Sequence, residues 1–543
     1  MTRMWLFGLL IVMFALATPA VFASDTIFIN GHIYTSNPAQ KWVQAIAITG
    51  SRIDALGTNE EIMGRKEPGS RVIDLQQRTV IPGIVDSHSH MWFGALALHG
   101  FNLATPDVYI EPKDEERLVS AIKEYASNHP GDKILFGRVQ FPNDVSRTLL
   151  DRAVADRPIV IHAPTEHTLW VNTKALEMAG ITEKAIDDPS IERYVVRDAD
   201  RRPTGVLRET AMILMDGVLA SQPFEEKVAW MREASRYLNR FGITSVTNAT
   251  GNLSEIEVYG ALRDRGELTV RTRTAFGTVA VNHRITPQFV ADLDKARTTY
   301  NDSWVSANLV KFFSDGAGGP ALYQPEEYKQ LVLELDKRGY QIMTHAIGAG
   351  PAKMVLDAYE EAVKVNGVRD RRFRMEHLIT TSLDDIPRLG KLSGTASMQA
   401  EFCCFNDGPG VRTNAWQTFL KTGTNLAYGS DWPCTFPPDP FLSIQQSVTR
   451  AFRALFTAPN PIAVPRFVTP EERLSVEQAV DAYTRGGAYA RFSEDRIGSL
   501  EPGKEADLAV LSQDIFGVRP EEIGNTQVVL TMVGGKIVFD QRK

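Results

Sequence analysis

Two histidines separated by one residue give the first sign of metal chemistry in this sequence. They are His88 and His90, which follow the short apolar run 81–85. We interpret this run as a buried strand. Side chains two residues apart on a strand point to the same side, so the two imidazoles should project together from its C-terminal end. Imidazole nitrogen is a common ligand of zinc and similar ions, so the pair could form half of a metal site.

Further residues of metal-binding type accompany other short apolar runs in the middle of the chain. Lys311 lies within one run, His345 and His377 each end one, and Asp431 follows the last. Each residue also has a purely structural explanation, such as a hydrogen-bonded core histidine, an ion-paired lysine or a helix N-cap. Their shared position at the ends of apolar runs favours a single site that includes the first pair.

The element that must position these residues is a series of apolar runs alternating with helical stretches. The runs are 81–85, 244–248, 270–275, 307–313, 341–345, 373–377, 395–399 and 425–430. Eight parallel strands with crossover helices form a (β/α)8 barrel, in which catalytic residues gather at the C-terminal strand ends. We therefore predict an α/β fold with a TIM-type barrel over 81–494. It carries a large, charged and helical insertion at about 105–237.

The two segments that flank this barrel region in the sequence are rich in β-branched residues. Asn30-Gly31 separates two such runs near the N-terminus, and Gly534-Gly535 separates two more near the C-terminus. Asn-Gly between strands is a strong hairpin signal. We predict that 24–80 and 495–543 combine into one small β-sandwich.

The first 23 residues have the pattern of a secretory signal peptide. Arg3 precedes an apolar run over 5–16, and Val21-Phe22-Ala23 is a small-residue cleavage signature. We predict cleavage after Ala23 and export to the periplasm or the medium. An uncleaved anchor is the alternative, because about 18 apolar residues nearly span a bilayer.

Composition narrows the class of protein. The chain has 543 residues, a formal net charge of −7 and 43% hydrophobic residues, which suits a large buried core and disfavours nucleic-acid binding. Three cysteines, Cys403, Cys404 and Cys434, are too few for a disulfide scaffold. We expect free buried thiols, with a Cys404–Cys434 bond as the alternative.

The segments around the candidate ligands resemble a known family as a set. They are 82–90, 310–316, 344–348, 374–377 and 429–433. These motifs resemble the amidohydrolase superfamily, and more closely its amidohydrolase-3 branch, which includes N-substituted formamide deformylases. The likeness extends over nearly all of the chain after the signal peptide.

The resemblance implies a role for each candidate ligand. His88 and His90 match the ligands of a first metal ion, and His345 and His377 match those of a second. Lys311 matches a lysine that is often carboxylated and bridges the two ions. Asp431 matches a residue that binds metal and shuttles the proton.

Five further residues are candidates for substrate contact. His167 and Glu209 lie in segments that resemble parts of the same branch, although His167 could also be purely structural. Trp92, Phe402 and Trp432 lie near candidate ligands and could line an apolar pocket, or could simply pack loops against the barrel.

Three segments differ from the usual pattern of the branch. Ala349 stands where an acid is common, Cys403 and Cys404 lie in a segment that often carries a histidine, and Asn248 lies where an acidic residue is usual. None of these changes removes a candidate ligand. They indicate an altered substrate pocket.

The predicted activity is hydrolysis of a C–N amide-type bond in a small amide, formamide or N-acyl substrate. Metal-activated water would attack, with Asp431 as general base and acid. One or two divalent ions are implied, zinc being the best match, with iron or manganese also suitable. The alternatives are ester or lactone hydrolysis, deamination, or a non-catalytic exported binding or regulatory protein. We expect no membrane association after signal cleavage, and the sequence leaves a homodimer open.

Overall fold

The computed structural model describes most of the chain after the predicted signal peptide. The described residues are 25–103, 114–139, 141, 143–163, 167–277, 285–316, 318–403, 407–435, 437–451 and 469–542. The predicted signal peptide, 1–23, lies outside them. Among the residues described, no helix has the length and apolar character needed to cross a membrane.

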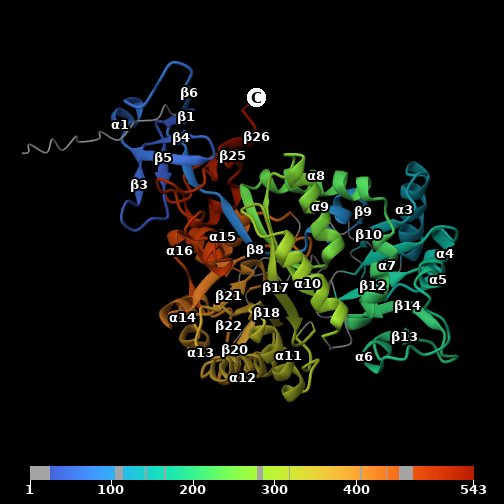
Figure 1. Cartoon of the computed structure of the whole chain (residues 1–543). Helices are drawn as coiled ribbons and strands as arrows, with labels where there is room; N and C mark the ends of the chain where they lie inside the picture. Colours follow the sequence, from blue (N-terminus) through green and yellow to red (C-terminus); the bar gives the residue numbers. More distant parts are fainter. Residues whose placement is uncertain are drawn as a thin grey trace, which may run out of the picture.

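An eight-stranded parallel sheet forms the centre of the molecule (Figure 1). Its strands are adjacent in sequence order: β8 (Ile84–Ser89), β15 (Ile243–Gly251), β16 (Arg271–Gly277), β17 (Val305–Phe313), β18 (Gln341–Ala346), β19 (Arg374–His377), β21 (Thr395–Met398) and β23 (Asn425–Tyr428). A parallel bridge between Ser89 and Trp432 brings the first strand to the segment after the last. The sheet is therefore a nearly closed barrel, and the predicted TIM-type fold is confirmed.

Helices follow the barrel strands and cover the outside of the sheet. They are α8 (Phe224–Asn239), α9 (Leu253–Asp264), α10 (Pro287–Thr299), α11 (Pro325–Lys337), α12 (Ala349–Asn366), α13 (Ile386–Lys391), α14 (Trp416–Lys421), α15 (Pro440–Thr449), α16 (Val476–Asp481) and α17 (Gly487–Ala490). In α11 the buried residues Tyr328, Val332 and Leu335 recur at helical spacing. This periodicity gives each helix an apolar face that can pack on the strands.

The first barrel strand differs from the predicted run 81–85. Ile81 belongs to β7 (Thr79–Pro82), which lies in a different sheet, and β8 begins only at Ile84. The chain changes sheets at Gly83, where an added Cβ would lie 2.4 Å from the Thr244 hydroxyl. An unbroken apolar run carries no signal for such a change, because both strands are buried.

Two sheets are built from the ends of the chain. The four-stranded sheet has the order β5 (Arg52–Gly57), β4 (Ala45–Thr49), β1 (Thr26–Ile29), β6 (Arg71–Asp74), and helix α1 (Asn59–Met63) follows β5. The six-stranded sheet has the order β26 (Lys536–Asp540), β25 (Val528–Val533), β24 (Leu508–Leu511), β7, β2 (His32–Tyr34), β3 (Trp42–Val43). The antiparallel pair β7–β24 joins the two ends of the chain.

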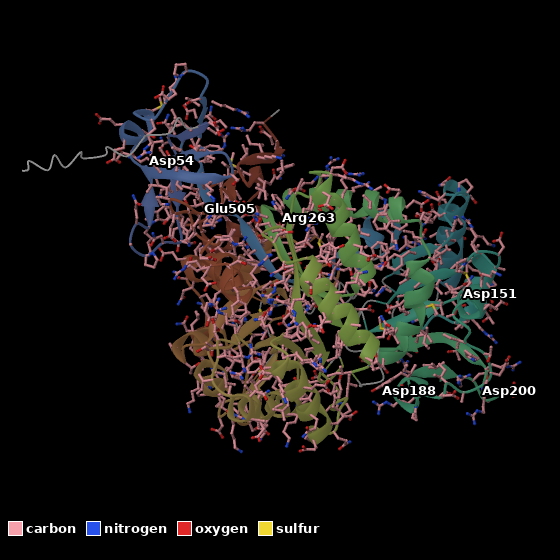
Figure 2. The ribbon with its side chains drawn as sticks, viewed as in Figure 1. Asp54, Asp151, Asp188, Asp200, Arg263 and Glu505 are labelled. Atoms are coloured by element: carbon pink, nitrogen blue, oxygen red, sulfur yellow. The ribbon has the colours of Figure 1, made fainter. Side chains whose placement is uncertain are left out.

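Apolar side chains of both terminal sheets share one cluster, including Phe28 and Ile46 from one sheet and Ile33 and Leu508 from the other. Ion pairs also connect these sheets with the barrel. Arg271 of β16 donates to Asp507 at 2.9 Å and to Glu505 at 3.1 Å. Glu505 lies between the two parts of the molecule in Figure 2.

The segment between β8 and β15 forms a six-stranded sheet of its own. Its order is β13 (Val195–Arg197), β14 (Pro203–Arg208), β12 (Thr168–Val171), β11 (Ile159–His162), β10 (Leu135–Val139), β9 (Phe101–Leu103). Its helices are α2 (Met91–His99), α3 (Glu115–Asn128), α4 (Arg147–Ala153), α5 (Thr173–Met178), α6 (Pro189–Glu192) and α7 (Asp216–Ala220). Asp151, Asp188 and Asp200 mark this part at the edge of Figure 2.

We had expected this segment to be helical, and its sheet was missed. Strands β10 and β11 are buried along their whole length. They therefore lack the polar and apolar alternation by which a half-exposed strand is recognised.

Candidate metal centre

The six predicted ligands lie together at the C-terminal mouth of the barrel. His88 is in β8, Lys311 in β17, His345 in β18 and His377 at the end of β19, while His90 and Asp431 follow β8 and β23. All except His90 are buried. Parallel strands of a closed sheet bring their C-terminal ends to one side, so residues distant in sequence meet there.

Three of these residues are close enough to share one ion. Ligand atoms of His88, His377 and Asp431 lie within 4.8 Å of one another. The Asp431 carboxylate also lies 3.1 Å from His90 Nε2. Two or three imidazoles with one carboxylate form a donor set typical of catalytic sites for divalent ions.

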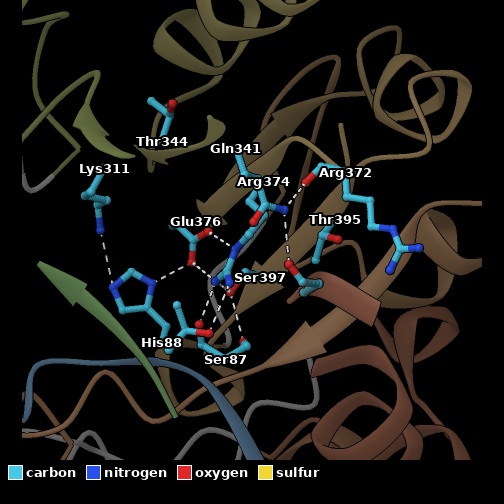
Figure 3. Close-up of polar contacts among 12 residues, drawn as sticks. Ser87, His88, Lys311, Gln341, Thr344, Arg372, Arg374, Glu376, Thr395 and Ser397 are labelled. Carbon is cyan, nitrogen blue, oxygen red and sulfur yellow. Dashed lines mark hydrogen bonds and ion pairs between the residues drawn. The ribbon is translucent and has the colours of Figure 1, made fainter. Parts of the chain in front are cut away.

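Glu376 holds the His88 ring in place from behind (Figure 3). Its carboxylate lies 2.6 Å from His88 Nδ1 and accepts 2.9 Å from Arg374 Nε. All three side chains are fully buried. Burial opposes the charged carboxylate, but Arg374 and His88 outweigh this and lower the pKa of Glu376. With Nδ1–H donated to Glu376, the Nε2 lone pair of His88 faces the site.

His377 is oriented in the same way by an amide. Its Nδ1 lies 2.6 Å from Gln399 Oε1, which leaves Nε2 available toward the other ligands. His377 and Asp431 have φ angles of 72° and 54°, in the left-handed region that non-glycine residues rarely adopt. Such conformations cost about 1–3 kcal/mol each and cluster at functional sites, because surrounding packing must impose them.

His345 reaches the same place with a different partner. Its ring centroid lies 4.5 Å from that of His377, but its Nε2 lies 3.0 Å from the carbonyl oxygen of Gly316. Ligation through Nε2 therefore requires that this hydrogen bond be exchanged. The neighbouring Asp315 carboxylate is buried and accepts the amide hydrogens of Ile347 and Gly348, which fixes the turn after β18.

Lys311 is fully buried and lies next to His88. Its Nζ is 3.4 Å from His88 Nε2 (Figure 3). The same atom lies 4.7 Å from the centroid of the Phe313 ring. Burial lowers the pKa of Lys311 to about 8, so more of the amine is neutral near pH 7 than for an exposed lysine. The side chain is therefore placed where a modified lysine could contribute an oxygen ligand.

Closure of the barrel positions Asp431. The Asp431 amide donates to the His88 carbonyl oxygen at 2.7 Å, and the His90 amide donates to the Trp432 carbonyl oxygen at 2.7 Å. These two hydrogen bonds join the segment around His88 to the segment around Asp431, and we call this junction the seam of the barrel. Candidate ligands lie on both sides of it. Sequence spacing contains no information on this seam, because its two sides are more than 300 residues apart.

Asp86 forms hydrogen bonds to both sides of the same seam and was not among the predicted site residues. Its carboxylate accepts from the His88 amide at 3.1 Å, and from the Ser430 amide and hydroxyl at 3.0 and 2.6 Å. Burial raises the pKa of Asp86 to about 7, although these hydrogen bonds oppose the shift. Its place between two ligand-bearing segments gives it, like Glu376 and Gln399, a positioning role.

Gly429 allows the two sides of the seam to approach. A Cβ at this position would lie 2.4 Å from the His88 backbone nitrogen, which cannot move independently of the strand. We expect Gly429→Ala to separate the segments and lower the metal content of the purified protein by at least about half. Elemental analysis would measure this. Gly350→Ala is the matched control, because a Cβ there meets nothing within 4 Å; equal metal loss in both variants would contradict the interpretation.

The protonation states at the site suit a metal ion. Burial lowers the pKa of His88 to about 3 and that of His377 to about 4, so both imidazoles are neutral near pH 7. Burial would raise the pKa of Asp431, but the neighbouring histidines outweigh it and hold the pKa well below its usual range. Neutral imidazole and ionised carboxylate are the forms that bind metals. These residues therefore fit a divalent ion.

A cavity of about 1060 Å³ opens onto this mouth. His90, Lys311, His345, His377 and Asp431 form part of its wall, together with four of the predicted substrate contacts: Trp92, His167, Glu209 and Phe402. His167 Nδ1 lies 3.0 Å from Glu209 Oε2, and the His167 ring centroid lies 5.5 Å from that of His345. Most of the remaining wall is apolar.

Trp432 does not belong to this wall, so we correct its predicted contact with substrate. Its side chain is fully buried, stacks on Tyr237 with 5.8 Å between ring centroids, and covers Gly94. The backbone of Trp432 serves the barrel seam while its ring points into the packing behind. Adjacency to Asp431 in sequence did not reveal this, because neighbouring side chains point in different directions.

The cysteines differ from the expectation in one respect. Cys403 is disulfide-bonded, whereas Cys434 is not part of a disulfide. Cys404 lies outside the described residues. A low cysteine count thus excludes a disulfide scaffold but not a local bond.

The barrel and its group of histidines with one carboxylate define the class of TIM-barrel metal-dependent hydrolases. The model of the amidohydrolase family matches residues 71–539, so the chain belongs to that family. The chain is 27% identical over 571 residues to the protein LONG AFTER FAR-RED 3 of Arabidopsis thaliana, covering 97% of this chain and 93% of that protein. It is 24% identical to the N-substituted formamide deformylase of Arthrobacter pascens, covering 95% and 98%.

A solved structure supports the same fold. The crystal structure of an uncharacterized metal-dependent hydrolase from Pyrococcus horikoshii superposes with a TM-score of 0.71 and 22% sequence identity. The match covers 91% of this chain and 99% of that one. With the family match, this makes the chain a metal-dependent hydrolase of the amidohydrolase superfamily.

Proposed function

We propose that this protein hydrolyses a C–N amide-type bond in a small molecule, with one or two divalent ions, zinc being the best match to the ligands. The observation that carries the proposal is the buried group of His88, His377 and Asp431 beside Lys311, at the base of a large cavity. The printed name of the Arthrobacter relative, an N-substituted formamide deformylase, supports an amide-type substrate.

The residues of this site would have different roles in hydrolysis, namely metal binding and proton transfer. A divalent ion, when bound, supplies Lewis acidity, which polarises a carbonyl group and lowers the pKa of water from about 16 to about 7. His88, His90, His345, His377 and Asp431 would hold it. Asp431 is ionised, so it can accept the proton of the attacking water and return it to the leaving nitrogen.

The cavity wall supplies orientation. The bonded pair His167 and Glu209 lies beside His345, on the part of the wall that a substrate at the metal centre would contact. Trp92 and Phe402 lie on the apolar part of the wall and would pack against a hydrocarbon group of the substrate.

Lys311 provides the sharpest test of a site for two ions. We propose that the buried amine reacts with carbon dioxide, forming an N–C bond and releasing one proton, so that the resulting carbamate would supply oxygen ligands for the ions. Wild-type protein should then contain about two metal ions per chain, and Lys311→Ala should lose at least one of them. Elemental analysis of both proteins decides this. One ion in both proteins would limit the site to a single metal, and no ion after reconstitution would contradict the proposed function.

The bond that is cleaved can be identified with matched substrates. An N-formyl or N-acyl alkylamine, the corresponding ester and an amino-substituted heterocycle present the same site with different leaving groups. We expect turnover of the amide to exceed that of the other two. Preferred cleavage of the ester would assign lactone or ester hydrolysis, and release of ammonia from the heterocycle would assign deamination.

We also propose that residues 1–23 direct export and are removed, so that the enzyme acts in the periplasm or medium. N-terminal sequencing of the protein recovered from those compartments should begin at Ser24. A product that begins at Met1 and sediments with membranes would favour the anchored alternative. A homodimer remains a further proposal, to be checked by the molar mass in solution.

A further inference from the structure

One wall of the cavity is a continuous helical segment that leads away from the metal centre. It consists of the 3-10 helix η1 (Glu209–Met215) followed directly by α7. Glu209, Ile213 and Asp216 lie on the face that lines the cavity, and Leu219 and Ala220 continue it. At about 2.0 Å per residue in a 3-10 helix, Glu209 and Asp216 are about 14 Å apart along this wall.

The near end of this wall is fixed at the metal centre. Glu209 holds His167, and its carboxylate packs so closely over Gly316 that a Cβ there would lie 2.2 Å from it. Gly316 in turn bonds His345. A substrate with its scissile amide at the metal centre would therefore extend along η1 toward Asp216.

Asp216 stands at the far end with its charge uncompensated. Among the described residues no side chain or amide bonds the Asp216 carboxylate, and its exposed surface faces the cavity. The Asp216 side chain is exposed toward the cavity, yet the surrounding protein raises its pKa to about 7, which reflects a cost of holding the charge there that no described group opposes. A cation at this point would relieve that cost.

The other charged groups near this end that the structure describes are already engaged. Lys227 Nζ lies 3.3 Å from the Ala220 carbonyl oxygen and 3.4 Å from Ser254 Oγ. Glu255 accepts from Asn248 at 2.9 Å and from Tyr259 at 2.6 Å, and burial raises its pKa to about 8. Asp292, also on the cavity wall, accepts 2.8 Å from Gln288 Nε2. Asp216 is thus the acid in this group that is left for a ligand.

We propose that the substrate is an elongated amide with an apolar middle and a terminal cationic group, an ammonium or guanidinium, which pairs with Asp216. This inference rests on the proposed function for the position of the amide, but the pairing with Asp216 can be measured without turnover. It assigns Asp216 as a specificity-determining residue at the far end of the cavity.

The first test compares charged and neutral substrates of equal length. Mono-N-formyl α,ω-diaminoalkanes of increasing length are each matched with the N-formyl n-alkylamine. In wild type we expect kcat/KM to favour the cationic substrate by about 10–100-fold at the best length, as a charged hydrogen bond allows. Asp216→Asn should abolish this preference, and the control Asp292→Asn should retain it. A preference that persists in Asp216→Asn, or is lost equally in Asp292→Asn, would overturn the proposal.

The second test is binding without hydrolysis. Calorimetry with n-alkylammonium ions and the corresponding alkanols measures the same pairing in the metal-loaded protein. We expect Asp216→Asn to weaken ammonium binding by about tenfold or more and alkanol binding by less than about twofold. If no amide is hydrolysed but ammonium binding requires Asp216, the cation site at Asp216 stands and the proposed function fails. If amides are hydrolysed without charge preference and both proteins bind ammonium equally, the function stands and the inference fails.

Discussion

Replacement of Asp431 by asparagine should lower kcat for an amide substrate by about 10²–10⁴-fold, the usual contribution of a positioned acid–base group. The substitution preserves shape, so the backbone bond from residue 431 to the His88 carbonyl oxygen should survive. An amide oxygen can still approach a metal ion, but the neutral side chain cannot accept the proton of the attacking water. Steady-state kinetics on protein of known metal content would measure the loss.

Asp439→Asn is the matched control for this experiment. Asp439 lies eight residues further along the chain, caps α15 by accepting the Phe441 amide hydrogen at 2.9 Å, and is outside the cavity wall. Asparagine caps helices about as well as aspartate, so the control should retain its activity. Undiminished kcat in metal-loaded Asp431→Asn would refute the assigned role, whereas equal losses in both variants would point to a general effect of charge.

Replacement of Glu376 by alanine should reduce the free energy of unfolding by about 3–5 kcal/mol, because it leaves the fully buried Arg374 guanidinium without a carboxylate. It also removes the acceptor that orients His88, so metal affinity should fall by about 10–100-fold. Urea unfolding of the metal-free protein isolates the first effect, and metal titration of the folded protein measures the second.

Two further variants separate charge from shape at Glu376. Glu376→Gln retains an oxygen for His88 Nδ1 but not the negative charge, so we expect a smaller loss of metal affinity than in the alanine variant. Asp357→Ala removes an exposed carboxylate that pairs with Lys353 and Arg388. It should cost less than about 1 kcal/mol, because Arg388 keeps Glu360 and Asp385 as partners. If Glu376→Ala unfolds at the same urea concentration as Asp357→Ala, the buried ion pair does not have the importance assigned to it.

The eight barrel strands could be predicted from the sequence because each is a short apolar run bounded by a helical stretch. Those runs also identified the ligands, since a parallel barrel places every strand end at one mouth. His88, Lys311 and His377 were found in this way, and the motifs around them indicated the family. Prediction failed where an apolar run carries no boundary signal, as at Gly83, and where strands are buried on both faces, as in β10 and β11.

Other features of the site depend on contacts between segments that are far apart in the sequence. Local periodicity and motifs were enough to predict the fold class and the family and to propose candidate ligands. Three features became visible only in the folded chain: Glu376 and Gln399 orient the histidines, Asp86 bonds both segments at the barrel closure, and the Trp432 ring points away from the cavity. The tertiary structure also placed Asp216 at the far end of that cavity. Side-chain direction and long-range pairing are set by packing of the whole chain, which no local pattern records.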